Sequence, residues 1–342
     1  MGCVAPSLEV EAVGAPANAT LPPVCRAVGE LPSPPTNLGR HAVGLPLTLA
    51  RWRYDVFHAP SYVAPLWGRI PTILSIHDVS YQRRPEWYPY RRDPLRRAFY
   101  RRSAARAAAI LVPSCFTADE VRAAYGIAAS RIHVIPLAAA PAFHEGEPAG
   151  GPPPDSGPRY LLHVGDLHVR RDLGTAVAVL SALRAVGGTW HLVLIGSDRG
   201  VWASLSATLS HAGLQNMVTW LPQVAEAELR QWYRRSFCLL YPSHYEGFGF
   251  PLVEAMACGL PVVAARASAT PEVTGEAGLL FPPGDATTAA QHVCTLATHA
   301  DLWLEQQAMG RHRAGVFDWT RTAAETLSCL EAVSRSGPAA EV

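Results

Sequence analysis

The sequence predicts an α/β protein built from two doubly wound, parallel-sheet domains. Its 342 residues suit two domains at the usual size of roughly 150 residues each. Short continuous apolar runs alternate with longer segments of helical periodicity, which is typical of parallel strands covered by helices on both faces. The stretch HEGEPAGGPPPDSGPR, residues 144–159, is rich in Pro and Gly and lacks any hydrophobic period, as expected of a linker.

These features set the expected domain bounds. They are an amino-terminal domain at 1–145, a linker at 146–158, a carboxy-terminal domain at 159–318 and a last helix at 319–335 that packs back toward the first domain. The two halves differ in charge, with 16 Arg against 10 acidic residues in 1–145 and 13 Arg against 18 in 146–342. We expect each half to bury its own core.

The first half contains four apolar runs that predict buried strands, with helical segments between them. The expected strands are 55–58, 72–76, 109–112 and 132–135, and the expected helices are 91–107 and 116–125. Residues 1–50 are rich in Pro and weakly periodic, with isolated glycines. We therefore expect the first domain to lack an initial strand and a Gly-rich loop.

The second half repeats the alternation with five apolar runs. The expected strands are 160–164, 191–195, 218–221, 238–241 and 261–265. The expected helices are 172–186, 201–212, 225–235 and 251–258, followed by 286–298, 301–314 and 319–334. Ligands of such sheets bind at the carboxyl ends of the strands, so we expect the site there, in a cleft between the domains.

Composition narrows the class of protein and its compartment. Seven scattered cysteines without a C-x-x-C pair indicate neither a disulfide framework nor a zinc site, and no secretion signal is present. No apolar run approaches the roughly 20 residues of a spanning helix. All 29 basic residues are Arg, and the absence of Lys excludes a P-loop. We expect a soluble, cytoplasmic protein.

The segment EGFGFPLVE, Glu246 to Glu254, concentrates the candidate site chemistry. Glu246 lies in the expected loop after strand 238–241, and Glu254 lies one turn into a short helix that begins near Pro251. Free N–H groups of Leu252 and Val253 at the helix start would form an anion site. Two carboxylates would repel a nearby phosphate unless they accept hydrogen bonds from neutral hydroxyl groups on either side of it. A nucleotide sugar is a ligand with hydroxyls in those positions. A surface loop with solvated glutamates remains the alternative.

A larger segment, HYEGFGFPLVEAMACGLPVVAARASATPEV at 244–273, closely resembles the donor-site segment of the retaining family 4 glycosyltransferases, which have the two-domain GT-B fold. The segment Leu161–Gly165 leading into Arg170–Leu173 resembles the family's glycine, arginine and lysine segment. Further matching segments are 192–196, 241–243, 278–283, 317–319, 58–60, 76–78 and 112–114. The resemblance spans about residues 50–335.

The resemblance implies a role for each matching residue. Glu254 would accept hydrogen bonds from the ribose, and Glu246 from hydroxyls of the transferred sugar. Arg170 and Arg171 would neutralise the leaving diphosphate, although Arg171 stands where the family usually has Lys. The remaining donor-binding positions would be Gly165 and the backbone N–H groups around Phe248, Gly249, Leu252 and Val253. His77 would lie near the anomeric centre, with Asp78 either orienting it or capping a loop.

The implied activity is transfer of a hexose-type sugar from a UDP or GDP donor to a glycan or lipid-linked acceptor, in polysaccharide biosynthesis, with retained anomeric configuration. No D-x-D motif or His or Cys pair at metal spacing occurs, so we expect no metal and no other cofactor. Two alternatives remain: a catalytically inactive binding module, and another GT-B enzyme such as a nucleotide-sugar epimerase.

Nine arginines in residues 83–106 raise the question of peripheral membrane association. A helical projection of this stretch gives no clean basic face opposite a clean apolar face, as an interfacial helix would have. A solvated helix and a peripheral membrane contact both remain open. Nucleic acid is not expected, because no aromatic residues interleave with the basic ones in the way that nucleic-acid binding favours.

Overall fold

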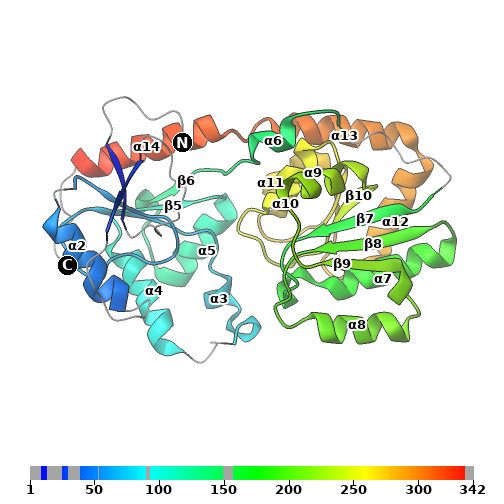
Figure 1. The fold of residues 1–342 in the computed structure, drawn as a ribbon, viewed down its shortest axis with the longest axis horizontal. Coiled ribbons are helices and arrows are strands. Elements are labelled where there is room, and N and C mark those ends of the chain that lie inside the picture. Colours follow the sequence, from blue (N-terminus) through cyan, green and yellow to red (C-terminus); the bar gives the residue numbers. More distant parts are fainter. Residues whose placement is uncertain are drawn as a thin grey trace. The chain divides into compact units, whose positions relative to one another are not determined.

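The computed structural model describes residues 9–13, 25–29, 39–52, 54–89, 93–148 and 157–335 (Figure 1). Contacts divide the chain into two compact units. Unit 1 comprises the described residues up to Pro136 together with the last helix, and unit 2 comprises Leu137–Asp318. Each unit is an α/β structure with its own parallel sheet, as the sequence predicts.

Unit 1 contains a four-stranded parallel sheet in the order β3-β4-β5-β6. Its strands are β3 (Phe57–Ala59), β4 (Thr72–Ser75), β5 (Ala109–Val112) and β6 (Ile132–Val134). Its helices are α2 (Leu45–Arg51), α3 (Ser80–Arg83), α4 (Pro94–Arg106), α5 (Cys115–Tyr125) and α14 (Trp319–Arg335), and a π-helical turn at Arg40–Gly44 leads into α2. The four expected strands are confirmed to within two residues at each end.

Alternate residues of these strands pack on opposite faces of the sheet. Leu74 and Ile110 belong to the core that includes Ala104 of α4 and Val121 of α5. Ile73 and Leu111 instead pack with Cys329 of α14. Helices therefore cover both faces, which explains why the strands are apolar throughout.

The segment before α2 contains elements that the sequence analysis did not predict. Strands β1 (Val10–Val13) and β2 (Cys25–Val28) pair in parallel as a separate two-stranded sheet. The Glu11 carboxylate of β1 forms an ion pair with Arg26 of β2 (3.0 Å), and it accepts a hydrogen bond from the Tyr54 hydroxyl (2.7 Å), which joins the small sheet to the rest of the unit. Among the described residues, the four-stranded sheet itself has no strand before β3.

Unit 2 contains a six-stranded parallel sheet in the order β12-β11-β10-β7-β8-β9. Its strands are β7 (Arg159–Val164), β8 (Trp190–Ile195), β9 (Val218–Leu221), β10 (Cys238–Tyr241), β11 (Val262–Ala265) and β12 (Gly278–Phe281). Its helices are α6 (Pro141–His144), α7 (Leu173–Val186), α8 (Trp202–His211), α9 (Glu226–Arg235), α10 (Phe250–Ala257), α11 (Thr270–Thr274), α12 (Ala286–Thr298) and α13 (Ala300–Ala314). The five expected strands are present, and β12, α6 and α11 are additional.

The boundary between the units lies earlier in the chain than the predicted linker. Residues 137–145, assigned to the first domain from sequence, cluster with unit 2. Phe143 of α6 packs edge-on against Tyr233 (ring centroids 5.9 Å apart), and Arg230 donates a hydrogen bond to the Ala142 carbonyl (3.1 Å). These contacts hold α6 on unit 2, so the change of unit follows Pro136. Most of the predicted linker lies outside the described residues.

Candidate functional site

The candidate site lies where the strand order of unit 2 reverses. From β7 the chain proceeds outward to β8 and β9, and then returns to place β10 on the other side of β7. The carboxyl ends of these two central strands diverge into loops, which in open α/β sheets is where ligands bind. The loop after β7 carries Arg170 and Arg171, and the loop after β10 carries Glu246.

Gly165, the first residue after β7, leaves room for the guanidinium of Arg171. Its φ of +136° is a conformation that favours glycine, and a Cβ at this position would lie 3.0 Å from Cζ of Arg171. The glycine that the sequence analysis assigned to the donor site therefore has a local structural reason. It lets a large cation lie directly over the backbone of the turn.

Arg171 and Glu246 form a buried ion pair at this point. Their side chains are only 10% and 6% exposed, and Nη1 of Arg171 contacts Oε1 of Glu246. The same Nη1 contacts the Tyr241 hydroxyl and lies 3.4 Å from Oγ of Ser243, while Cζ stands 5.3 Å from the centroid of the Tyr241 ring. Burial lowers the pKa of Arg171, but the Glu246 carboxylate and the Tyr241 side chain together more than offset this, so the pKa is raised.

The backbone of Glu246 is also anchored. Its N–H donates to Oγ of Ser268 (2.8 Å), and its carbonyl accepts from the N–H of Ala269 (3.3 Å). Ser268 has a positive φ of +52°, which turns the chain between β11 and α11 toward the loop. The backbone of Glu246 is thus fixed by two hydrogen bonds, and its carboxylate is fixed by Arg171.

His163 is a buried polar residue of the site that the sequence analysis did not identify. Its ring stacks on Tyr241 (centroids 5.7 Å apart), and Nδ1 lies 3.2 Å from the Leu240 carbonyl. Burial, and then the charge of Arg171, lower the pKa of His163 to about 3, so the ring is neutral and Nδ1–H donates to the carbonyl. A histidine inside the expected strand 160–164 was the only signal in the sequence.

The two arginines of the β7 loop have different surroundings. The Arg171 side chain points into the buried pair, whereas the Arg170 side chain is half-buried. The Arg170 carbonyl accepts from the N–H of His244 (2.8 Å), and Nε2 of His244 lies 3.2 Å from Oδ2 of Asp172. These bonds join the β7 loop to the β10 loop across the reversal of the sheet.

The start of α10 differs from the sequence interpretation in one respect. Gly249 caps the helix with a φ of +93°, and Pro251 lies within its first two residues, as predicted. The N–H of Leu252, predicted to be free, donates to the Gly249 carbonyl (3.0 Å). The left-handed turn at Gly249 brings its carbonyl over the helix start, and this corrects the expected anion site. The Phe248 ring is buried against Phe317 (centroids 5.4 Å apart).

Glu254 does not take part in the buried ion pair. It lies on α10, and its Oε2 accepts a hydrogen bond from the Tyr233 hydroxyl of α9 (2.8 Å). Burial raises the pKa of Glu254, an effect that this hydrogen bond partly offsets. The prediction that the two glutamates occupy different elements, loop and helix, is confirmed.

His77 belongs to unit 1, where it follows β4. Its Nε2 lies 3.1 Å from the Pro60 carbonyl, and its ring stands edge-on to Tyr62 (centroids 6.1 Å apart). Oδ1 of Asp78 accepts from both the N–H (2.9 Å) and the hydroxyl (2.6 Å) of Ser80. Of the two roles considered for Asp78, these contacts match the loop cap, because Asp78 closes the turn that leads to Ser80.

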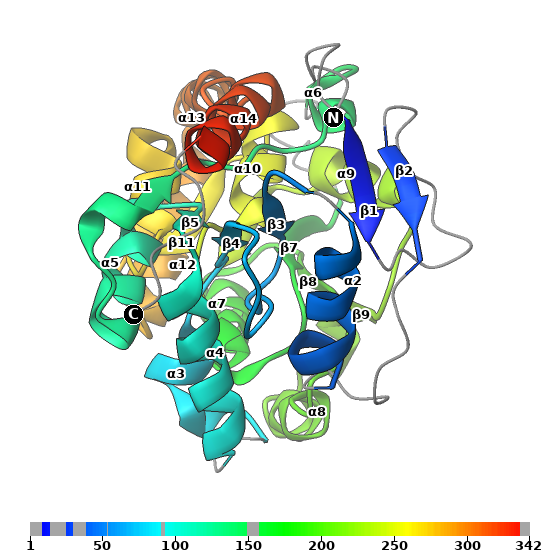
Figure 2. The same cartoon turned by 90° about the vertical axis from the view of Figure 1, so that its left-hand side faces the viewer.

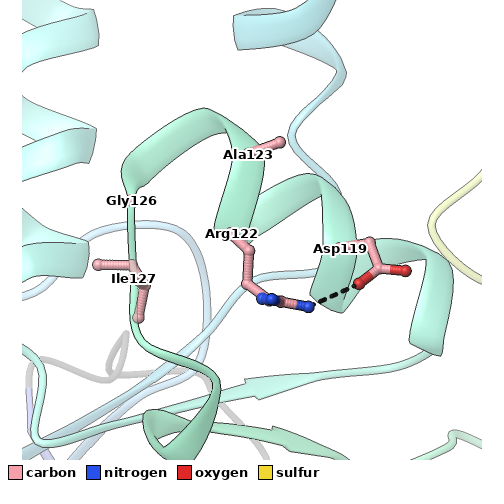
Figure 3. Close-up of a pocket in the computed structure, with 5 residues that line it drawn as sticks. All are labelled: Asp119, Arg122, Ala123, Gly126 and Ile127. Carbon is pink, nitrogen blue, oxygen red and sulfur yellow. Dashed lines mark hydrogen bonds and ion pairs between the residues drawn. The ribbon is translucent and has the colours of Figure 1, made fainter.

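A pocket in unit 1 is lined by none of the predicted site residues (Figure 3). It lies at the carboxyl end of α5 and is lined by Asp119, Arg122, Ala123, Gly126 and Ile127. Asp119 and Arg122 form an ion pair with each other at 3.2 Å. We do not assign this pocket to the candidate site.

Neither a cluster of metal ligands nor a membrane-spanning helix occurs among the described residues. In the ranges between residues 9 and 335 that the structure describes, no three His, Cys, Asp or Glu side chains group as metal ligands. Over the same ranges, no helix combines the length and the apolar character that crossing a membrane requires.

Comparison with known proteins identifies the class. The fold of the chain is shared with solved GT-B glycosyltransferases. It superposes on a sucrose-phosphate synthase of Thermosynechococcus elongatus with a TM-score of 0.74, at 19% identity, over 96% of this chain and 90% of the other. WaaG, a glycosyltransferase of lipopolysaccharide biosynthesis, gives a TM-score of 0.71 at 16% identity, over 95% and 91%. The two Rossmann-like units therefore define a GT-B protein.

The family follows from two sequence models. The model described as Glycosyltransferase Family 4 matches residues 5–141, and the model described as Glycosyl transferases group 1 matches residues 158–299. The chain belongs to the family 4 glycosyltransferases. Because the first match begins at residue 5, the similarity to the family extends further toward the amino terminus than the expected span of about residues 50–335.

Curated relatives agree with this assignment. O-antigen chain mannosyltransferase B of Escherichia coli is 27% identical over 284 residues, which cover 81% of this chain and 74% of the relative. A D-inositol 3-phosphate glycosyltransferase of Paenarthrobacter aurescens is 29% identical over 312 residues, covering 82% and 74%. The protein is a glycosyltransferase.

Proposed function

We propose that the protein transfers a hexose-type sugar from a nucleotide diphosphate sugar to a glycan or lipid-linked acceptor, with retention of the anomeric configuration and without a metal. The observation that carries the proposal is the buried Arg171–Glu246 pair at the reversal of the unit 2 sheet. A buried ion pair contributes little net stability, because both charges lose their hydration. This favours a functional role for the pair over a purely stabilising one. Its place at the carboxyl ends of β7 and β10 is the expected ligand position for this fold.

The nature of the donor is supported by the relatives. A structural neighbour, Anabaena Alr3699/HepE, was solved in complex with UDP and, in another structure, with UDP and glucose. Two of the matched relatives are named as mannosyltransferases, one for the O-antigen chain and one for MMP. We infer a UDP or GDP sugar as the donor class.

We assign the donor contacts as follows. The half-buried Arg170 takes the diphosphate, and Arg171 supports its charge from beneath while it holds Glu246. The Glu246 carboxylate accepts hydrogen bonds from hydroxyls of the transferred sugar. Tyr233 occupies Oε2 of Glu254, so Oε1 is the oxygen proposed for the ribose hydroxyls. Backbone N–H groups near Gly249 and Val253 complete the donor contacts.

Transfer then requires stabilisation of the departing nucleoside diphosphate. As the glycosidic C–O bond breaks, negative charge grows on the leaving phosphate oxygen, and the acceptor hydroxyl attacks the same face of the sugar. Arg170 stabilises the growing charge in place of a metal. The acceptor proton passes to the leaving phosphate oxygen, so that no protein nucleophile is consumed. His77 is the residue that we propose for the anomeric centre.

Calorimetric titration of the full chain with UDP, GDP and ADP in the presence of EDTA tests the donor site. One base should bind preferentially, and Glu254→Ala should weaken that binding at least about 10-fold, since a charge-assisted hydrogen bond contributes roughly 1.5–3 kcal/mol. Arg170→Ala should slow transfer more than it weakens donor binding. Equal affinity of wild type and Glu254→Ala would refute the ribose assignment. Binding that requires added Mg²⁺ would refute metal independence.

A further inference from the structure

One surface of unit 1 combines exposed apolar side chains with arginines from three separate segments. The segments are Gly39–Trp52, Ser61–Ile70 and α4 (Figure 2). They adjoin one another: the Trp67 indole N–H donates to the Ala42 carbonyl (2.6 Å), and Nη2 of Arg106 on α4 donates to the Gly68 carbonyl (3.2 Å). We call this surface the α2–α4 face.

The apolar part of the α2–α4 face is exposed to solvent. Five of the eleven large apolar side chains that are exposed in the described ranges lie on it: Val43, Leu47, Trp52, Trp67 and Leu95, which are 38%, 42%, 41%, 45% and 75% exposed. Positions 43 and 47 are one helical turn apart and so lie on one side of the helical segment. Such a concentration on one surface normally marks a site of interaction.

The segments that form the α2–α4 face are basic and contain no acidic residue. The three segments contain eight arginines and neither Asp nor Glu. Arg51 continues the exposed stripe of Val43 and Leu47, because positions 47 and 51 are one turn apart in α2. An acidic residue, Asp93, precedes α4, where it caps the helix and pairs with Arg96.

Helix α4 contributes Arg102 and Arg106 to the same surface. Its residue Phe99 contacts the His41 ring (centroids 5.8 Å apart), which fixes the orientation of α4 relative to the α2 segment. Leu95, Arg102 and Arg106 lie on the same side of α4 as Phe99 by helical spacing. Taken alone, residues 83–106 lack an apolar face; the apolar component comes from α2 and from the loop that contains Trp67.

We propose that the α2–α4 face docks on the surface of a lipid bilayer that contains anionic lipids. Tryptophan and leucine side chains enter the boundary between headgroups and acyl chains, while arginines at the rim pair with lipid phosphates. A nucleic acid would match the arginines but would leave the Val43 and Leu47 stripe without a partner. A bilayer matches both components. The inference is independent of the donor site, because no residue assigned to that site lies on this face.

Flotation of the full chain with lipid vesicles tests the proposal without any activity assay. The protein should float with vesicles of phosphatidylcholine and phosphatidylglycerol but not with phosphatidylcholine alone, and binding should fall as salt rises from about 0.1 to 0.5 M, since screening weakens the arginine contacts. Brominated acyl chains should quench tryptophan fluorescence in wild type, and should quench it less in Trp52→Ser.

Two pairs of matched variants distinguish vesicle binding through the α2–α4 face from non-specific hydrophobic adsorption. Leu47→Glu should weaken vesicle binding about 10-fold or more, whereas Leu304→Glu, at an equally exposed helical leucine of unit 2, should change it less than about twofold. Trp52→Ser should act like Leu47→Glu, and Trp319→Ser, at a tryptophan of equal exposure, like Leu304→Glu. Circular dichroism melting curves of all four variants check that they fold.

Three results would overturn the proposal. They are equal flotation with neutral and anionic vesicles, equal effects of Leu47→Glu and Leu304→Glu, and the absence of flotation in a wild-type protein that melts cooperatively. Binding of an RNA or of an acidic peptide that is abolished by Leu47→Glu, with no vesicle binding, would assign the face to that partner instead.

Discussion

Replacing Arg171 by Met should destabilise the protein strongly, because it leaves the Glu246 carboxylate buried without its counter-charge. The two side chains are only 10% and 6% exposed, so water cannot take over the role of the guanidinium. Removing one partner of a buried pair typically costs about 3–5 kcal/mol of unfolding free energy. The double variant Arg171→Met/Glu246→Gln removes both charges and should regain most of that loss, since no buried charge is left unpaired.

Urea unfolding curves of the wild type, the two single variants and the double variant measure this coupling. An exposed pair provides the reference: Arg321 and Glu325 on α14 lie 2.7 Å apart but are 62% and 35% exposed. Arg321→Met should cost less than about 1 kcal/mol. The reasoning is refuted if Arg171→Met costs no more than Arg321→Met, or if the double variant is as unstable as Arg171→Met alone.

Two further predictions concern neighbouring residues. Gly165→Ala should lower the unfolding free energy by about 1–3 kcal/mol, because it forces a side chain into a left-handed conformation against the Arg171 guanidinium, while Gly174→Ala in the first turn of α7 should be neutral or stabilising; chemical denaturation of both variants checks this. Burial raises the pKa of Glu254 above its ordinary 4.5, so the stability it contributes is present at low pH and is lost as pH rises through the folded-state pKa. Glu254→Gln should therefore lose less stability than the wild type between about pH 4 and 7, and parallel urea midpoints across that range would contradict the assignment.

The sheets were predictable because they depend on local patterns. Strands buried on both faces are continuously apolar, and this held for β5 and β10, whose residues are all buried. Strand β12 escaped prediction because its glycine start and partial exposure weaken that pattern. The membership of α6 in unit 2 could not be predicted, because it depends on contacts with residues nearly 90 positions away in sequence.

Sequence reasoning selects residues for the candidate site but does not predict which of them contact one another. Spacing and resemblance selected Glu246, Arg170 and Arg171, whereas the pairing of Arg171 with Glu246 joins residues 75 positions apart. Hydrophobic periodicity carries no information about a contact between side chains so far apart in sequence. The hydrogen bond from the Leu252 N–H could not be predicted either, because the direction of the Gly249 carbonyl depends on a backbone angle that only the folded chain reveals.

The return of α14 to unit 1 has a consequence for synthesis on the ribosome. Cys329 packs on the sheet of unit 1, and the Thr322 hydroxyl donates to the Pro136 carbonyl (2.6 Å), so residues 186 positions apart in sequence contact each other in the same unit. Unit 2 is one continuous stretch and can fold as soon as it emerges. Unit 1 begins first but finishes last, since one face of its sheet waits uncovered until the final helix is translated. During that interval the nascent amino-terminal half is the part of the chain that most needs a chaperone.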